Sequence, residues 1–420
     1  MLTYFPTPYP DEWWYSVLCR YYASTGIREH SIVKEQLFGG NSGAHMGIVF
    51  PNGTIAKVIQ QLPTELFDIK EILLHHTPFL YYTRMYPLEE RKDMLEALCH
   101  GETIQLTHLW KSFQRASWRP RYCPACASEE RERYGEPYWH TDHQIPLMSV
   151  CTKHHCRLHQ MELDAPYPAL NQRFYLLADV KMQDAVTDYP AWEEQVSAIV
   201  REYWKLPLTV GPTEHNNLTQ LLKDKGYLAI YRQGNISLEP KRLYTDLQTF
   251  YGAEKVQESF GDTLDAGMVN RITRWKQLLP DRYILLQAMI GAPTALVFRE
   301  EPLPDPLKEQ LQSMAAEGGF CTMKQVAEQL GVKRHELNTL LCYYGMEPFW
   351  MPPTKGKHAV ARTALLRCTL EQEELERIEA ISKNLGYRCA GAFALDCVRY
   401  VMELSERRNK LKEGERRYKI

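Results

Sequence analysis

The segment 122–160, YCPACASEERERYGEPYWHTDHQIPLMSVCTKHHCRLHQ, contains four of the eleven cysteines and five of the fourteen histidines of the chain. A Cys-x-x-Cys pair followed about 25 residues later by Cys-x-x-His is a standard spacing for four soft ligands arranged tetrahedrally around zinc. We therefore predict one structural Zn²⁺ ion bound by Cys123, Cys126, Cys151 and His154. Four protein ligands leave no open position for catalysis, so the ion would serve to fold a segment too small to be stable alone.

Three nearby residues compete for places in this ligand set. Cys156 is the main competitor for the third or fourth position, and His155 and His159 are weaker ones. A reduced cluster without metal is one alternative. A thioredoxin-like redox site is another, which needs a strand before the Cys-x-x-Cys motif and a helix beginning within it. The basic stretch from Lys111 to Arg121 before the motif and the charged run SEERERYGE after it disfavour that alternative. The other seven cysteines are scattered, which is typical of reduced thiols that fill core space.

Composition limits the remaining possibilities. With 420 residues, 44% of them hydrophobic, the chain has the length of two to four globular domains. No run approaches the roughly 18 apolar residues of a membrane span, and the N-terminus lacks the pattern of a secretory signal.

The charge of the chain is unevenly distributed along the sequence, although the net charge is only −2. Residues 321–420 carry a net charge of +5, so the other residues together carry −7. Such a chain is suited to meet DNA at one end and protein at the other.

Residues 319–346, GFCTMKQVAEQLGVKRHELNTLLCYYGM, have the pattern of a helix-turn-helix. Ala327 is the small residue at the helix crossing, Gly331 permits the turn, and Leu337 and Leu340 face the first helix. The second helix would present four polar residues to the major groove of DNA, and these are Lys333, Arg334, His335 and Asn338. The alternative is a helix pair used only for packing or as a protein interface.

Residues 362–405 read as a strand, a helix at 371–384, a turn at Gly386 and a helix at about 389–404. This order resembles a ribbon-helix-helix module, in which two chains pair their strands, so it predicts a homodimer. Arg367 and Thr369 would then face DNA, and a plain helical hairpin is the alternative. The tail from 406 carries seven Lys/Arg, among them Arg407 and Arg408; such a run is usually a mobile solvated tail, but here we expect it to contact phosphate.

Motifs of the common enzyme classes are missing from the sequence. The P-loop, H-E-x-x-H and G-x-S-x-G patterns do not occur. Two polar pairs, Asp11-Glu12 and His75-His76, are most simply interpreted as surface or capping residues. We therefore expect a protein that is not an enzyme.

Several of these motifs together resemble the TniQ/TnsD family of transposon target-selection proteins. The opening FPTPYPDEWWYSVLCRYYASTG, the LFGG at 37–40, the CPAC knuckle, the Tyr138-Trp139 pair, the His143–Pro146 segment and the Cys-x-x-His close carry the resemblance over about residues 1–165. His140 departs from the pattern, since the family often has Arg there. The region 271–298 is more similar to TnsD proteins than to short TniQ adaptors.

The resemblance implies a mainly α, multi-domain fold in a cytoplasmic bacterial protein. The domains would be a TniQ-like N-terminal domain at 1–120, a zinc-binding segment at 121–165, a helical TnsD-like region at 166–318, the helix-turn-helix at 319–358, and a ribbon-helix-helix with a basic tail at 359–420.

The function implied by the resemblance is recognition of a double-stranded DNA attachment site and recruitment of the AAA+ regulator TnsC, which directs the transposase. The alternative is a TniQ-type adaptor that links an RNA-guided CRISPR effector complex to TnsC without reading DNA. A zinc-bearing transcription regulator is a third alternative, and the N-terminal motifs oppose it.

Overall fold

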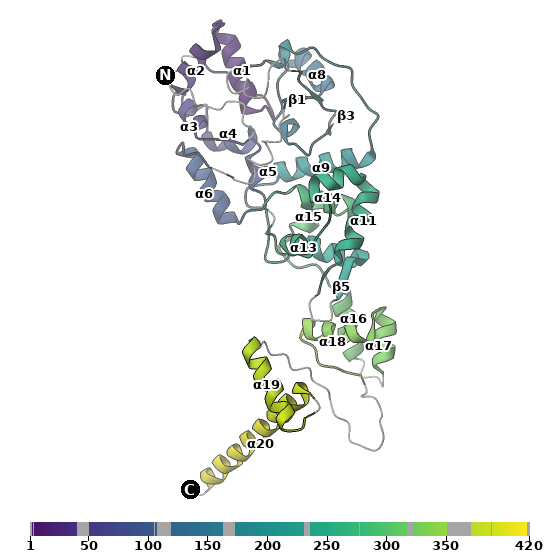
Figure 1. The fold of residues 1–420 in the computed structure, drawn as a ribbon. Coiled ribbons are helices and arrows are strands. Elements are labelled where there is room, and N and C mark those ends of the chain that lie inside the picture. The colour runs from purple at the N-terminus through teal and green to yellow at the C-terminus, as the bar shows by residue number, and fades with distance from the viewer. Residues whose placement is uncertain are drawn as a thin grey trace. The chain divides into compact units, whose positions relative to one another are not determined.

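The structure is a computed structural model that describes residues 2, 4–39, 50–104, 106, 119–162, 173–230, 236–276, 278–316, 322–350, 371–387 and 389–417, with backbone alone from 406 onwards. Most described elements are helices, and the described strands form three short two-stranded antiparallel sheets (Figure 1). The chain divides into two compact units, Met1–Met351 and Pro352–Ile420. The predicted mainly α, multi-domain architecture is confirmed.

The first unit begins with short helices around an aromatic-rich core. The first helix contributes six buried positions in a row, from Trp14 to Cys19, and it ends at Gly26, whose φ of 68° glycine adopts without strain. Asp68 caps the fourth helix by accepting a hydrogen bond from the Lys70 amide. The bounds are α1 Trp14–Thr25, α2 His30–Phe38, α3 Thr54–Ile59, α4 Ile69–His75, α5 Phe79–Thr83 and α6 Leu88–Cys99.

The next segment combines one helix with two narrow ribbons. Strand β1 (Arg121–Tyr122) pairs antiparallel with β4 (His159–Gln160), so the beginning and the end of the segment lie side by side. Between them come α8 (Pro124–Tyr134), the 3₁₀ turn η1 (Asp142–Gln144) and the hairpin of β2 (Val150–Cys151) with β3 (Cys156–Arg157). Because β1 pairs with β4, the two ends of the segment meet, and this brings its cysteines together.

Helix α9 (Ala191–Lys205) is the central element of the first unit. It packs against α14 (Asp281–Ile290), against α5 and against strand β2, so it touches regions that lie far apart in the sequence. Its buried face recurs at helical spacing in Val196, Ile199, Val200, Tyr203 and Trp204. One continuous hydrophobic core runs from Phe5 to Phe298, across the predicted boundaries at 120 and 165.

Two buried arginines join the N-terminal helices to the loop that follows α9. Arg84, fully buried at the end of α5, donates hydrogen bonds to the carbonyl oxygens of Tyr203, Leu206, Pro207 and Val210. Arg91 on α6 donates to the carbonyls of Leu208 and Val210. Tyr203 lies in the last turn of α9 and the other carbonyls follow the helix, so none of them has an intrahelical donor and the arginines satisfy them.

Further helices complete the first unit. Gly226 makes a turn with a φ of 89°, and α14 (Asp281–Ile290) buries Tyr283 to Ala288. The elements are η3 Leu177–Asp179, α10 Asn217–Leu222, the π-turn η4 Lys223–Tyr227, β5 Leu228–Ile230, β6 Ile236–Leu238, α11 Pro240–Tyr251, α12 Ala253–Phe260, α13 Ala266–Thr273 and α15 Thr294–Val297.

The last part of the first unit has a small hydrophobic core of its own. Helices α16 (Pro306–Ala316), α17 (Met323–Leu330) and α18 (Arg334–Tyr344) supply its fully buried residues. The β5–β6 ribbon, about 100 residues earlier in the sequence, packs against α18 through Ile230 and Ile236. The ribbon therefore ties this three-helix group to the rest of the unit.

The second unit contains α19 (Gln372–Asn384) and α20 (Ala390–Arg417), which contact each other. Gly386 lies between them with a φ of 75°, as predicted for the turn. Helix α20 extends to Arg417, beyond the predicted end at about 404, so the backbone of the basic residues 406–417 continues the helix. Their composition explains this, because Glu, Lys, Arg and Leu favour a helix that has already been nucleated.

Candidate metal centre and helix-turn-helix

The predicted zinc ligands come from two tight turns. Cys123 is the N-cap of α8, and its Sγ accepts a hydrogen bond from the Cys126 amide at 3.4 Å; Pro124 occupies the first helical position. Cys151 ends strand β2, and His154 lies in the turn that leads back to β3. Each turn thus presents two ligands, as the Cys-x-x-Cys and Cys-x-x-His spacings require.

The four side chains converge on one point. The Sγ atom of Cys126 lies 3.7 Å from that of Cys151 and 3.2 Å from His154 Nδ1. His154 Nδ1 lies 3.6 Å from Cys123 Sγ and 3.7 Å from Cys151 Sγ. Metal–ligand distances of 2.0–2.3 Å in a tetrahedron give ligand–ligand distances of about 3.5–3.8 Å. All four atoms lie within 4.8 Å of one another, so the cluster could hold one metal ion.

The chemistry of the cluster also suits a cation. The three cysteines are at most 4% exposed, and crowded buried thiols cannot all ionise without a cation among them. Hydrogen bonds from Cys126 and Cys151 lower the pKa of the Cys123 thiol to about 3, whereas the same contact with Cys123 raises the pKa of Cys126. The N-terminus of α8 stabilises negative charge at Cys123 as well.

The three competing residues are arranged differently. His155 points to Glu194, with 2.5 Å between Nδ1 and Oε1, and the Nε2 atom of His159 donates to the Asp184 carbonyl at 2.9 Å. Cys156 lies opposite Cys151 in the β2–β3 pair, and its Sγ is 3.4 Å from Cys123 Sγ. It is therefore a fourth sulfur beside the cluster, outside the group of three cysteines and one histidine that converge on one point.

A carboxylate supports the histidine ligand from outside. The Nε2 atom of His154 lies 3.1 Å from Glu129 Oε2, and Lys153 also contacts that carboxylate. Lys153 lowers the pKa of Glu129, so the carboxylate is ionised at neutral pH. Histidine ligands commonly donate their second N–H to such a carboxylate, which fixes the tautomer and the ring orientation.

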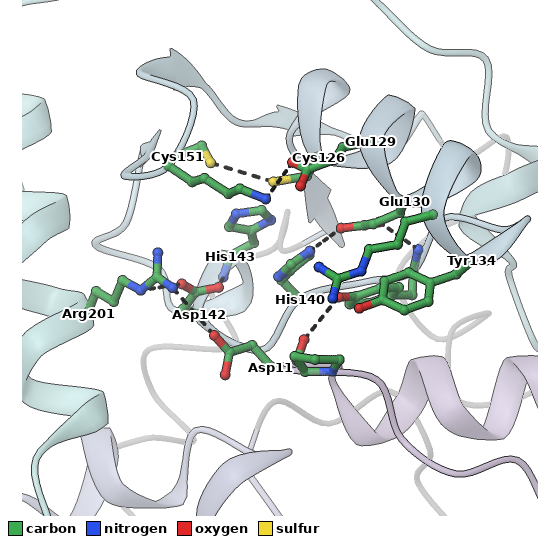
Figure 2. Close-up of a pocket in the computed structure, with 14 residues that line it drawn as sticks. Asp11, Cys126, Glu129, Glu130, Tyr134, His140, Asp142, His143, Cys151 and Arg201 are labelled. Atoms are coloured by element: carbon green, nitrogen blue, oxygen red, sulfur yellow. Dashed lines mark hydrogen bonds and ion pairs between the residues drawn. The ribbon is translucent and has the colours of Figure 1, made fainter.

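A pocket of about 170 Å³ adjoins this cluster (Figure 2). Sequence reasoning missed it because its residues come from the N-terminal segment, α8, η1, β2 and α9. Asp11 lines the pocket and pairs with Arg201 and Lys205 of α9. Its neighbour Glu12 is fully buried and paired with Arg20 at 2.9 Å, so its interpretation as a surface or capping residue is wrong. Arg20 lies only eight residues further along the chain, but whether the pair is buried depends on the packing around it.

Helices α17 and α18 form the predicted helix-turn-helix geometry. Thr322 and Gln325 make a capping box at the start of α17, and Gly331 makes the turn with a φ of 66°. Ala327, Leu337 and Leu340 are at most 3% exposed, as expected for the helix crossing.

The predicted DNA-contacting residues of this motif lie at the start of α18. Lys333, Arg334 and His335 are exposed, and Asn338 is half-buried on the next turn. Arg367 and Thr369, and the strand predicted around them, lie outside the described residues. Arg407 and Arg408 belong to α20, for which the structure describes only the backbone at these positions. DNA contact by all of these residues stays a prediction.

Comparison with known proteins places the N-terminal part of the chain in a class. Residues 3–158 match the family model of TniQ, which covers the N-terminal helices and the complete Cys/His cluster. The chain therefore contains a TniQ domain, and the resemblance to the TniQ/TnsD family is confirmed over this region.

One curated relative is the transposon Tn7 transposition protein TnsD of Escherichia coli, which is 28% identical over 154 residues. The aligned region is 36% of this chain and spans 30% of the length of that relative. Separately, among the described residues, no helix is long and apolar enough to span a membrane.

Proposed function

We propose that this chain selects the insertion site of a transposon by binding a double-stranded DNA attachment site. The observation that carries the proposal is the combination in one chain of a TniQ domain and a separate helix-turn-helix with an exposed basic end. The similarity of 154 residues of the chain to a transposition protein gives the biological setting.

The reading element would be α18. In a helix-turn-helix, the N-terminal residues of the second helix contact base edges in the major groove. Arg334 suits guanine and Asn338 suits adenine, and they lie four residues apart, about one turn along the helix. His335 would also contact base edges, and Arg367 and Thr369 would face the major groove from a ribbon-helix-helix. Lys333 and the segment with Arg407 and Arg408 would contact phosphates.

The TniQ domain would recruit the AAA+ regulator TnsC, which passes the signal to the transposase. The proposed Cys123/Cys126/Cys151/His154 zinc ion would hold that domain in shape without taking part in chemistry. The family resemblance supports a targeting role without catalysis.

The test begins with selection of duplexes from a fragmented genomic pool by the full chain. The double variant Arg334→Ala/Asn338→Ala is then compared with the wild type on the enriched duplex and on a scrambled duplex in a gel-shift assay. Two base contacts at about 1–3 kcal/mol each predict a loss of specificity of at least about 30-fold. A matched control, Lys308→Ala/Gln312→Ala, removes one cation and one amide from the exposed side of α16 and should retain the preference.

The outcomes separate the two functional classes. Unchanged discrimination in the double variant would sink the assignment of α18 as the reading helix. No enrichment of any duplex would refute direct DNA reading and favour the adaptor that links a CRISPR effector complex to TnsC. A pull-down with TnsC from the same transposon should succeed for the wild type and for the double variant, because the predicted TnsC-binding domain is separate from α18.

A further inference from the structure

The pocket beside the Cys/His cluster holds a second convergence of ligand atoms. The side chains of His140, Asp142 and His143 each offer an atom, and these atoms all lie within 4.8 Å of one another. Asp142 and His143 lie in the 3₁₀ turn η1, and His140 lies two residues before it in the bridge to Glu12. The two imidazole rings are adjacent, with 4.7 Å between their centroids and an interplanar angle of 35°. Figure 2 shows these side chains facing the pocket.

The three side chains are held by neighbours of the kind that surround metal ligands. Glu130 is 6% exposed, and its Oε1 lies 2.5 Å from His140 Nε2, which leaves His140 Nδ1 for another partner. Asp142 accepts a hydrogen bond from the His143 amide at 2.9 Å, and its other oxygen is 3.6 Å from Arg201 Nε. Histidines that bind a metal regularly donate their second ring N–H to a carboxylate, and carboxylates that bind a metal are themselves regularly hydrogen-bonded.

An independent observation comes from the buried nitrogen of His143. The residue is 3% exposed, and its Nδ1 has no hydrogen-bond partner among the described residues. A buried polar atom of this kind normally binds a protein group, an ordered water or an ion. The charge favours a cation, since the pocket is lined by four carboxylates against three cationic side chains: Asp11, Glu129, Glu130 and Asp142 against Arg133, Lys153 and Arg201.

We propose that His140, Asp142 and His143 bind a second divalent transition-metal ion, separate from the one predicted at the cysteines. Two imidazoles and one carboxylate suit Zn²⁺, Co²⁺, Ni²⁺ or Fe²⁺. The pocket of about 170 Å³ leaves room for water molecules that complete the coordination.

The location of the site suggests a structural effect of the second ion. His140 forms a β-bridge with Glu12, and the Thr141 amide donates to the Asp11 carbonyl at 2.8 Å. An ion bound at residues 140–143 would therefore stiffen the contact between the N-terminal segment and the Cys/His segment. This inference does not depend on the proposed DNA-binding function, because it concerns only the TniQ domain.

The experiment titrates the zinc-loaded full chain with Co²⁺ and measures metal content and visible absorption. We expect one tightly held zinc and one additional cobalt per chain. The bound cobalt should show weak absorption bands of nitrogen and oxygen ligands, without a strong sulfur-to-cobalt band. Asp142→Asn and His140→Asn should each abolish the second equivalent while the zinc is retained. Glu130→Gln should weaken cobalt binding about 10–100-fold.

The control variant is His155→Asn, which removes a histidine of the same segment that points away from the pocket to Glu194. It should bind both ions as the wild type does. Retention of one zinc shows that each variant is folded. If Asp142→Asn loses its zinc, the variants His140→Asn and Glu130→Gln test whether the second ion binds at this site. A wild type that binds only one ion, a second cobalt that these variants still bind tightly, or a sulfur-to-cobalt band would overturn the site.

Discussion

Replacement of Arg84 by methionine provides a quantitative test of how the TniQ domain is joined to the helical region after it. The guanidinium donates to the carbonyls of Tyr203 at 3.0 Å, Leu206 at 2.6 Å and Pro207 at 2.7 Å, and also to Val210. Methionine is apolar and can donate none of these bonds. The carbonyls of Tyr203 and Leu206 would lose this donor, whereas the Val210 carbonyl keeps its bond from Arg91 and the Pro207 carbonyl its bond from the Val210 amide.

The expected cost follows from two opposing terms. A hydrogen bond with a charged donor contributes about 1.5–3 kcal/mol, so four of them contribute about 6–12 kcal/mol. Against this, burial lowers the pKa of Arg84 from 12.5 to about 9, which corresponds to about 5 kcal/mol that disfavours the buried charge. The difference predicts that Arg84→Met lowers the free energy of unfolding by about 4 kcal/mol.

The assay is urea unfolding followed by circular dichroism, together with limited proteolysis of the loop at 206–211. The variant should unfold at lower urea, and the loop should be cleaved faster because its anchor is missing. Arg28→Met is the control, since Arg28 is exposed on the surface of the same domain, and it should change the free energy of unfolding by less than about 0.5 kcal/mol. A loss below 1 kcal/mol in Arg84→Met would refute the reasoning that these hydrogen bonds outweigh the cost of burying the charge.

Two further predictions concern the metal centre and a buried acid. Cys126→Ser, or removal of metal with a strong chelator, should unfold the segment 121–162 and make it sensitive to protease, whereas Cys342→Ser at an exposed position should change neither metal content nor cleavage. Burial raises the pKa of Glu12 from 4.5 to about 7 despite its pairing with Arg20, so its contribution to stability is complete below pH 4.5 and is lost as the pH rises through about 7. Glu12→Gln should therefore remove a pH-dependent loss of about 3 kcal/mol between pH 4.5 and 8, and identical pH profiles of unfolding for the variant and the wild type would contradict this.

Local features of the fold could be predicted from the sequence. The two helices around Gly331 and the two ligand-bearing turns occur where the pattern indicates. In each case the signal lies within a few residues: a capping residue, a glycine that adopts positive φ, a helical repeat, or a fixed spacing of cysteines. Helix α20 was harder to delimit, because a charged tail can continue a helix or fray with little difference in local free energy.

The pocket and the buried arginines could not be predicted. Arg201 and Asp142 lie 59 positions apart in the sequence and meet only because α9 packs against the Cys/His segment. The fully buried Glu12 is adjacent to Asp11, a partly exposed pocket residue, so no local pattern distinguishes the two. The environment of a charged side chain depends on which distant carbonyl or carboxylate meets it, and that is decided by packing.

The sequence by itself determined the helical class, the family of the N-terminal third, and the segment whose cysteines and histidines can meet around one metal ion. These properties follow from short-range spacing, which is read along the chain. Only the tertiary structure decided that Cys156 lies outside the convergent group, that His140, Asp142 and His143 face one pocket, and that Arg84 anchors the loop after α9. The physical reason is that a metal site or a buried hydrogen-bond network requires atoms within about 4 Å, and packing of distant segments alone sets that distance.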